Sequence, residues 1–159
     1  MLHLRPIKQE DNAAMALVIR KALEEYGVNK PGTVYTDPTT DDLYTLFKPA
    51  KSIYWVATYH EELIGGCGIY PTKGLPEGYA ELVKLYLKKE HRGTGIGKVL
   101  MQQAIQSAKE MGYTHLYLES LPELNQAVGL YESLGFTKMD QPLGDSGHFA
   151  CNLWMEYVL

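Results

Sequence analysis

The residues of this sequence most able to do chemistry lie between positions 84 and 98, where Leu-Tyr-Leu leads into Arg92-Gly-Thr-Gly-Ile-Gly-Lys98. Glycines let a backbone approach a ligand closely, and successive N–H groups at the start of a helix form a hollow that binds anions. Five of the fifteen lysines and arginines fall in this segment: Lys84, Lys88, Lys89, Arg92 and Lys98. The segment therefore predicts a site for a phosphate or pyrophosphate group, with a ligand-free strand-to-helix turn as the alternative.

Two common phosphate-binding motifs do not fit this segment. A dinucleotide-binding G-x-G-x-x-G motif that starts at Gly93 would need glycine where Lys98 stands. A P-loop would need glycine where Arg92 stands and serine or threonine where Val99 stands. What remains is a third pattern, Arg92-x-x-Gly95-x-Gly97.

The elements that must position this segment follow from the spacing of apolar residues. Helices are predicted at about 11–26, 41–47, 95–111 and 123–134. Strands are predicted at 2–6, 53–59, 63–70, 79–87, 115–119, 136–139 and 151–158, the second and third of which form a hairpin. The segment 28–40, rich in Pro, Gly, Thr and Asp, is expected to be a loop over a site. This order predicts an α+β fold with mixed α/β character.

Several residues are expected to shape individual elements. Asp11 is suited to cap the first helix, and Ser120 with Glu123 is suited to form a capping box. In the helix at 95–111, the residues expected to face inward are Ile96, Val99, Leu100, Ala104, Ser107, Ala108 and Met111. The glycines expected to weaken their strand or to permit a bulge are Gly65, Gly66 and Gly68. By strand alternation, Glu81 is predicted to share a face with Val83, Leu85 and Leu87.

Composition narrows the class of protein. The 159 residues fit one domain, and 45% hydrophobic with 21% charged residues is typical of a soluble globular protein. A net charge of −4 argues against a nucleic-acid partner, and no apolar run approaches the ~20 residues that cross a membrane. We expect a cytoplasmic protein with no membrane partner. Cys67 and Cys151 show no disulfide or metal-ligand pattern and are expected to be packing residues.

The pattern Arg92-x-x-Gly95-x-Gly97 after a Leu-Tyr-Leu strand resembles the coenzyme A pyrophosphate loop of the GNAT N-acetyltransferases. Residues 125–136, Asn-Gln-Ala-Val-Gly-Leu-Tyr-Glu-Ser-Leu-Gly-Phe, look like the second coenzyme-binding element of that family. The resemblance covers nearly the whole chain and implies a single N-acetyltransferase domain over residues 2–159. It implies a GNAT-like central mixed, mostly antiparallel twisted sheet flanked by helices. It also implies direct transfer of acetyl from acetyl-CoA, without a metal, to a primary amine of a small molecule or peptide in a ternary complex.

The resemblance also implies roles for individual residues. Main-chain groups of Leu85 and Leu87 would bind the pantetheine arm, and an amide near Leu85 would polarise the thioester carbonyl where the sheet splays. Asn125 would contact the coenzyme, cap its helix, or do both. The pyrophosphate would be bound by Arg92, Gly93, Thr94, Gly95, Ile96, Gly97 and Lys98.

Two residues are implied to act as catalysts. Tyr131 resembles the general acid that protonates the departing thiolate, with core aromatic packing as its alternative. Glu81 would accept the amine proton directly or through water, with a solvated strand-end carboxylate as its alternative. The histidines show no metal-ligand spacing and are expected to be structural or exposed: His3, His60, His91, His115 and His148.

The acceptor amine, the acyl-chain preference and the oligomeric state stay open, with a homodimer among the alternatives. A cationic amine surrounded by acidic and aromatic groups is one expectation and an ordinary acidic surface is the other. The residues concerned are Glu24, Glu25, Tyr26, Tyr35, Asp37, Asp41 and Asp42. Asp145, His148 and Asn152, in a carboxy-terminal segment of open role (142–155), are further candidates to reach the acceptor. Two functions compete with catalysis: a noncatalytic acyl-CoA binding or sensing domain, and a phosphate-binding regulatory module.

Overall fold

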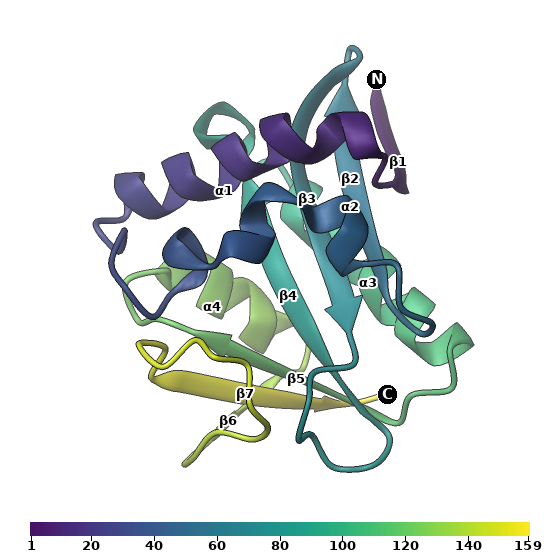
Figure 1. The fold of residues 1–159 in the computed structure, drawn as a ribbon, viewed down its shortest axis with the longest axis vertical. Coiled ribbons are helices and arrows are strands. Elements are labelled where there is room, and N and C mark those ends of the chain that lie inside the picture. Colours follow the sequence, from purple (N-terminus) through teal and green to yellow (C-terminus); the bar gives the residue numbers. More distant parts are fainter.

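A seven-stranded sheet with four α-helices makes up the computed structural model, which describes residues 1–159 (Figure 1). The strands are β1 (Leu2–Pro6), β2 (Ile53–Tyr59), β3 (Glu62–Tyr70), β4 (Tyr79–Leu87), β5 (His115–Ser120), β6 (Thr137–Met139) and β7 (Leu153–Val158). The helices are α1 (Asn12–Glu25), α2 (Leu43–Leu46), α3 (Ile96–Glu110) and α4 (Asn125–Ser133). The strand order is β1-β2-β3-β4-β5-β7-β6, and every neighbouring pair except β4 and β5 is antiparallel. The predicted α+β class is confirmed.

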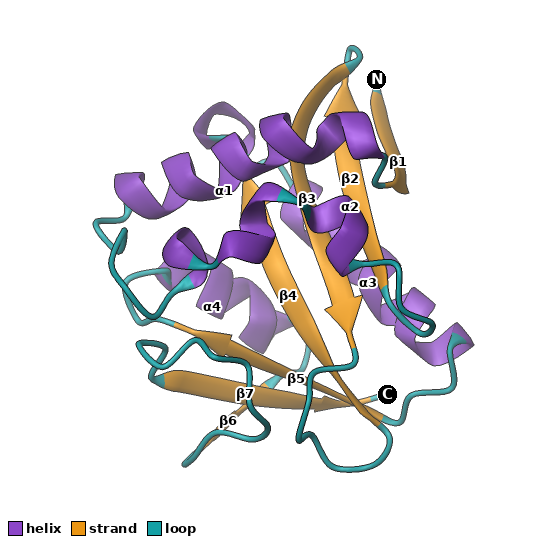
Figure 2. Ribbon diagram, in the orientation of Figure 1, coloured by secondary structure: helices purple, strands orange, loops and turns teal.

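Helices cover both faces of the sheet and create two hydrophobic cores (Figure 2). The first core lies between one face of the sheet and the helices α3 and α4, and in it Leu100, Met101 and Ala104 are fully buried. The second lies under α1 and α2, where Met15 and Ile19 recur at helical spacing. None of the helices is long and apolar enough to cross a membrane.

Three local predictions are wrong. Val99 is 40% exposed instead of facing inward, because it lies on the outer side of α3. Ser120 and Glu123 form no capping box, because Ser120 is still part of β5 and the N-cap position of α4 is Leu124. Asp11 stands at the N-cap position of α1, but its carboxylate accepts hydrogen bonds from Arg5 and from the Lys8 amide instead of capping that helix.

The glycines of β3 make room for the ring of Tyr54. A Cβ on Gly66 would lie 2.4 Å from the Tyr54 ring, and one on Gly68 would lie 2.6 Å from it. The fully buried Tyr54 hydroxyl reaches past β3 and donates a 2.7 Å hydrogen bond to the carbonyl oxygen of Lys84. The predicted irregularity of β3 is present beside Gly65, where the register with β2 shifts.

A second irregularity lies on β4 at Lys84 and reverses the strand's faces. Gly66 pairs with Tyr86 but Gly68 pairs with Val83, so β4 carries one extra residue, and Lys84 has φ +55°. Val83 consequently packs in the second core, whereas Leu85 and Leu87 pack against the first. The prediction that Glu81 shares a face with Leu85 and Leu87 is wrong, because it assumed an unbroken alternation.

The sheet opens between its two parallel strands. β4 and β5 pair only from Tyr79–Glu81 to His115–Tyr117 and then diverge, as Figure 1 shows. The Lys88 amide donates to the carbonyl oxygen of Ile64, on the β3 side. Since successive strand amides point to opposite edges, the Leu87 amide points into the opening, where β5 supplies no partner. The predicted splay of the sheet is confirmed.

Candidate active site

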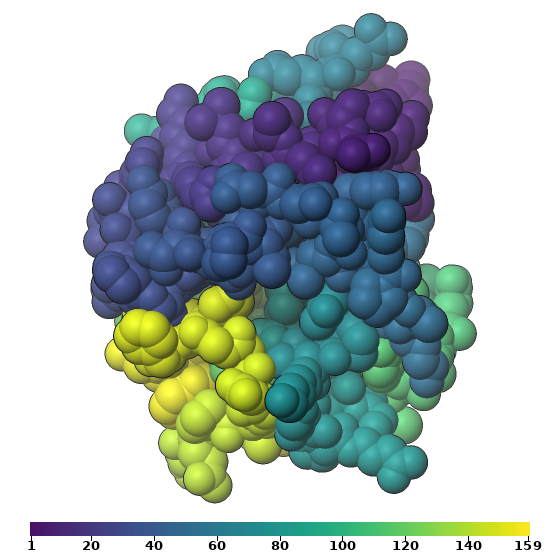
Figure 3. All heavy atoms as spheres, viewed as in Figure 1, coloured from purple at the N-terminus to yellow at the C-terminus, as the bar shows by residue number.

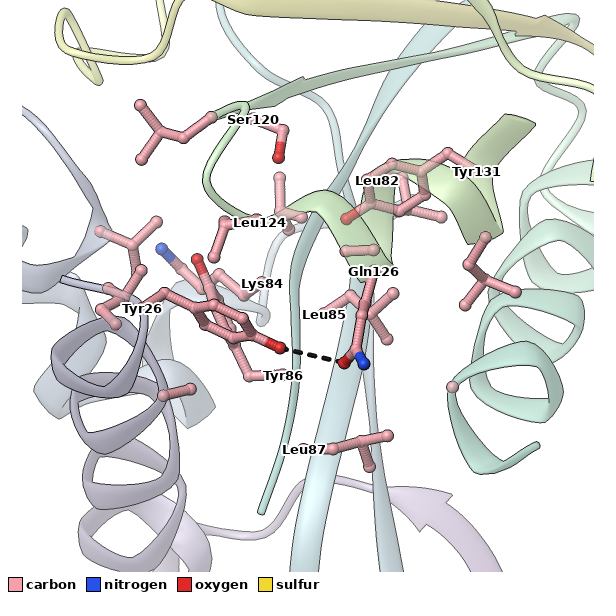
Figure 4. A pocket seen from close by; sticks show the side chains of 18 of the residues that line it. Tyr26, Leu82, Lys84, Leu85, Tyr86, Leu87, Ser120, Leu124, Gln126 and Tyr131 are labelled. Atoms are coloured by element: carbon pink, nitrogen blue, oxygen red, sulfur yellow. Dashed lines mark hydrogen bonds between the residues drawn. The ribbon is translucent and has the colours of Figure 1, made fainter. Parts of the chain in front are cut away.

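A cavity of about 500 Å³ occupies the opening between β4 and β5 (Figure 4). Its walls come from α1, the segment after α1 (Thr33 and Val34), β4, the glycine turn with the start of α3, the end of β5, α4 and the carboxy-terminal segment. The prediction that the segment 28–40 lies over a site agrees with this lining. Nine of the predicted site residues line it: Glu81, Leu85, Leu87, Arg92, Gly93, Gly95, Gly97, Lys98 and Tyr131. Three do not line it. Thr94 is exposed and its hydroxyl donates to the His91 carbonyl, and Ile96 is buried in the first core. Asn125 is exposed at the first residue of α4, and the predicted capping role is wrong because Leu124 occupies the N-cap position.

The glycine turn at one end of the cavity needs its glycines for their backbone conformation. Gly93 has φ +73° and Gly95, the N-cap of α3, has φ +88°. No atom lies within 4 Å of a Cβ built on either residue, so their φ angles, and not crowding, exclude larger residues. The first N–H groups of α3 lack helical acceptors and carry the positive end of the helix dipole. This end of the cavity is suited to an anion.

Arg92 is held at the mouth of the cavity by groups from two other elements. Its Nε donates to the Leu87 carbonyl oxygen at 3.1 Å, and its guanidinium pairs with Glu25 at 2.9 Å and lies 5.0 Å from the centre of the Tyr26 ring. The Tyr26 hydroxyl in turn donates to Oε1 of Gln126 on α4, at 3.2 Å (Figure 4). Side chains of α1 and α4 therefore meet beside the glycine turn.

Tyr131 lies on the cavity wall with its ring packed in the core. It is 6% exposed, and its ring centre lies 5.9 Å from that of Phe136. Its hydroxyl makes no hydrogen bond within the protein, and no buried polar side-chain atom lacks a partner, so the hydroxyl must be open to the cavity. Burial raises the pKa of Tyr131 above its ordinary value, which keeps the phenol protonated and able to donate a proton.

Glu81 lies at the last residue pair that joins β4 to β5, opposite Tyr117. It is only 3% exposed, so the alternative of a solvated carboxylate is wrong. Burial raises the pKa of Glu81 to about 7, although a 2.6 Å hydrogen bond from the Thr72 hydroxyl partly opposes that change. A carboxyl group with this pKa can accept a proton near neutral pH.

A polar cluster beside Glu81 was not predicted as a unit. The Lys84 ammonium lies 3.8 Å from Oδ2 of Asp37, and Nε2 of His148 lies 2.7 Å from the same oxygen. Burial alone would raise the pKa of Asp37, but the hydrogen bonds from His148 and Thr39, together with Lys84, hold it well below its ordinary range. The yellow carboxy-terminal part of the chain lies against the blue segment that precedes β2 in Figure 3.

Sequence spacing holds no signal for this cluster, because Asp37 and His148 are 111 residues apart. His148, expected to be structural or exposed, lines the cavity. Lys84, grouped in the sequence with the phosphate-site cations, is turned by the bulge toward Asp37. Asp145 and Asn152 do not line the cavity, whereas Cys151 does.

The acidic residues near α1 do not surround a cationic acceptor. Four of them are engaged elsewhere: Glu24 by the Tyr35 hydroxyl, Glu25 by Arg92, Asp41 by Arg20, and Asp42 by Asn12 and the Thr45 amide. Of the seven acidic and aromatic candidates, Tyr26 alone lines the cavity. The expectation of an acidic acceptor pocket is therefore wrong. At the end of the cavity away from the glycine turn, the charged and titratable groups come from β4, β5 and the carboxy-terminal segment: Glu81, Lys84, Glu119 and His148.

Known proteins share this sequence pattern. A family model described as the acetyltransferase (GNAT) family matches residues 15–136. The uncharacterized N-acetyltransferase YjgM of Escherichia coli is 39% identical over 96% of this chain and 92% of that protein. Human N-acetyltransferase 8B is 34% identical over 70% of this chain, which spans about half (52%) of the human protein.

Solved structures share the fold. A GNAT-family acetyltransferase from Staphylococcus aureus superposes with a TM-score of 0.84 at 17% identity, over 99% of both chains. The PaiA N-acetyltransferase from Thermoplasma acidophilum, solved in complex with coenzyme A, superposes with a TM-score of 0.75 at 20% identity, over 100% of this chain and 99% of that one. The fold agrees with the family match and with the YjgM relative, and the chain is therefore an acetyltransferase of the GNAT family.

Proposed function

We propose that this protein transfers acetyl from acetyl-CoA directly to a primary amine of a small molecule or peptide, with both substrates bound in the cavity between β4 and β5. The observation that carries the proposal is the pair of groups on one cavity: a phenol that stays protonated, Tyr131, and a carboxyl group that ionises near neutral pH, Glu81. Amine acetylation needs one proton donor and one proton acceptor. A cytoplasmic location is part of the same proposal.

The residues at the glycine turn fit a coenzyme A pyrophosphate. Gly93 and Gly95 supply a backbone without side chains, and the N–H groups from Thr94 to Gly97 lie at the positive end of α3. Arg92 and Lys98 line the same end of the cavity and supply charge. Main-chain groups of Leu85 and Leu87 would hold the pantetheine arm, and Asn125 would meet the coenzyme from the exposed start of α4.

The proposed transfer balances one proton lost and one gained. The amine nitrogen bonds to the carbonyl carbon of the thioester while the carbon–sulfur bond breaks. Glu81 accepts the proton that the amine loses, directly or through water, and Tyr131 protonates the departing thiolate. The amide of Leu85 faces the opening in the sheet and would hydrogen-bond the carbonyl oxygen as negative charge develops on it.

Cys151 is the one cysteine on the cavity, and its chemistry favours direct transfer over a covalent acyl-enzyme. Burial raises the pKa of the Cys151 thiol to about 12, so the thiol is neutral near pH 7. Since the thiolate is the nucleophilic form, Cys151 is a poor acyl acceptor. The substrates should therefore react in a ternary complex.

Thiol release from acetyl-CoA tests the proposed function. The purified protein should release coenzyme A only when an amine is present, in a panel of amino acids, polyamines, aminoglycosides and short peptides, with mass spectrometry to identify the acetylated product. Initial-velocity lines should intersect, as expected for a ternary complex. Coenzyme binding without thiol release across the panel would instead indicate a sensing domain, and parallel lines would indicate an acyl-enzyme.

Gly95→Val is expected to lower coenzyme A affinity by at least 100-fold in calorimetry, because the variant places a β-branched side chain where the pyrophosphate must approach the backbone. Forcing a side chain to φ +88° also destabilises the protein by about 1–2 kcal/mol. Gly112→Val is the matched control, because Gly112 has the same φ of +88°, has no atom within 4 Å of a built Cβ, and lies past the far end of α3. Equal affinity in the two folded variants would show that the turn does not bind the pyrophosphate.

A further inference from the structure

We propose that Lys84 binds a carboxylate group of the acceptor, so that the preferred acceptors are α-amino acids rather than simple amines, polyamines or neutral peptide termini. This inference rests on the proposed acetyl transfer and names the acceptor class for the same cavity. It depends on where the bulge in β4 places the Lys84 side chain, on what that side chain contacts, and on its distance along the strand from Glu81.

The Lys84 side chain is enclosed and lines the cavity (Figure 4). It is 3% exposed, and the bulge directs it to the side of the sheet that faces Asp37 and His148 instead of the glycine turn. The Tyr54 hydroxyl, which donates to the Lys84 carbonyl, fixes this arrangement. A lysine is rarely buried unless its ammonium is paired, so the groups that contact the Lys84 ammonium indicate its role.

The Lys84 ammonium makes no hydrogen bond within the protein, and its one ion-pair partner is Asp37. Its nearest carboxylate oxygen is Oδ2 of Asp37 at 3.8 Å, which is too far for a hydrogen bond. The Asp37 oxygens already accept hydrogen bonds from the amide and hydroxyl of Thr39 and pair with His148. Because no buried polar side-chain atom lacks a partner, the ammonium must be open to the cavity that Lys84 lines, and none of its three donors makes a hydrogen bond within the protein. Burial lowers the pKa of Lys84, and Asp37 and Glu81 only partly offset that effect.

A buried cation whose donors make no hydrogen bond within the protein is a site for an anion. The pyrophosphate site lies at the glycine turn, where Arg92 and Lys98 provide charge, so it does not need Lys84. Lys84 instead lies three residues from Glu81, which spans at most about 10 Å along a strand. A ligand that places its amine at Glu81 and its carboxylate at Lys84 would satisfy both groups, and an α-amino acid carries both. A polyamine would bring a second cation toward Lys84.

Matched acceptors test this inference in the wild-type protein. The twenty common L-amino acids and their α-amides, which lack the carboxylate charge, should be compared by kcat/KM. We expect the acids to be preferred by about 10- to 100-fold, the size of a lost charge-assisted hydrogen bond. Lys84→Met keeps the aliphatic stem and should remove this preference by lowering kcat/KM for the acids alone. The acid-to-amide ratio, compared between the two proteins, cancels the intrinsic reactivity of each amine. Lys109→Met, at an exposed position in the last turn of α3, should leave the ratio unchanged.

A binding measurement separates this inference from the proposed function. N-acetyl-L-leucine and N-acetyl-L-leucinamide should be titrated into the protein with coenzyme A present, in calorimetry. Tighter binding of the acid, lost in Lys84→Met, would support the carboxylate site even if no amine were acetylated. Equal binding of acid and amide to the wild type, or an equal loss for both in Lys84→Met, would overturn it even if acetyl transfer were found. The wild-type comparison decides the question if Lys84→Met does not fold.

Discussion

Tyr131→Phe is expected to lower kcat by about 10²- to 10⁴-fold, the usual contribution of a general acid, provided that chemistry limits turnover. The variant keeps the ring that packs against Phe136 and removes the hydroxyl alone. Because that hydroxyl makes no hydrogen bond within the protein, melting temperature and coenzyme affinity should change little. Steady-state acetylation of an identified acceptor, with chemistry confirmed as the slow step, measures the effect.

Tyr113→Phe is the control for Tyr131→Phe. Tyr113 donates an exposed hydrogen bond to the Lys51 carbonyl oxygen and does not line the cavity, so removing the Tyr113 hydroxyl should leave kcat unchanged. If Tyr131→Phe also kept the wild-type kcat, Tyr131 would be a core aromatic residue and the thiolate would take its proton from another source. If the melting temperature fell with kcat, packing and catalysis would have to be separated by rates at several temperatures.

Glu81→Gln is expected to lower kcat by about 10²- to 10⁴-fold near neutral pH, because glutamine cannot accept the amine proton. Glu81 must be ionised to act as a base, so the wild-type kcat/KM, which reports the groups of the free enzyme, should rise with pH and level off above a midpoint near the pKa of about 7. This rise should be absent from the variant. Glu77→Gln, at an exposed position, is the matched control and should keep both the rate and the pH profile. A wild-type kcat in Glu81→Gln would leave water as the relay.

The same substitution should change stability with a defined sign. The pKa of Glu81 is raised in the folded state, from 4.5 to about 7, so its stabilising contribution is fully present below pH 4.5 and is lost as pH rises through 7. A pKa shift of that size corresponds to a loss of about 3 kcal/mol in the free energy of unfolding between low and high pH. Glu81→Gln stays neutral and should therefore unfold at higher denaturant concentration than the wild type at pH 8, with the difference shrinking toward pH 5. A less stable variant at pH 8 would mean that the carboxylate is well solvated.

The local sequence pattern was sufficient to predict the elements that form the proposed coenzyme site, which are β4, the glycine turn and α3. The bounds of β4 and the start of α3 follow from apolar spacing and from glycines within a few residues of one another, and the structure agrees with them. The buried state of Glu81 was not predictable in the same way, because it depends on Thr72 and on the strand β5 that packs beside it. A strand alone does not reveal which of its residues face a core.

The acceptor half depends on contacts between distant segments. The bulge that turns Lys84 is fixed by Tyr54, thirty residues earlier in the chain, and by the glycines of β3 that make space for its ring. The pairing of Asp37 with His148 joins two loops that no periodicity links. Regular alternation therefore misplaced Glu81 relative to Leu85, because a single inserted residue exchanges the faces of everything beyond it.

The short ladder between β4 and β5, three residue pairs long, is the only strand pairing that joins the half-sheet β1–β4 to the half-sheet formed by β5, β7 and β6. A ligand that lies in the opening touches both halves and binds only when they are assembled. Such a ligand stabilises the folded state by RT ln(1 + [L]/Kd), about 2.7 kcal/mol at one hundred times Kd. The thermal resistance of this protein, and its lifetime against proteolysis, would then follow the concentration of its own acyl donor.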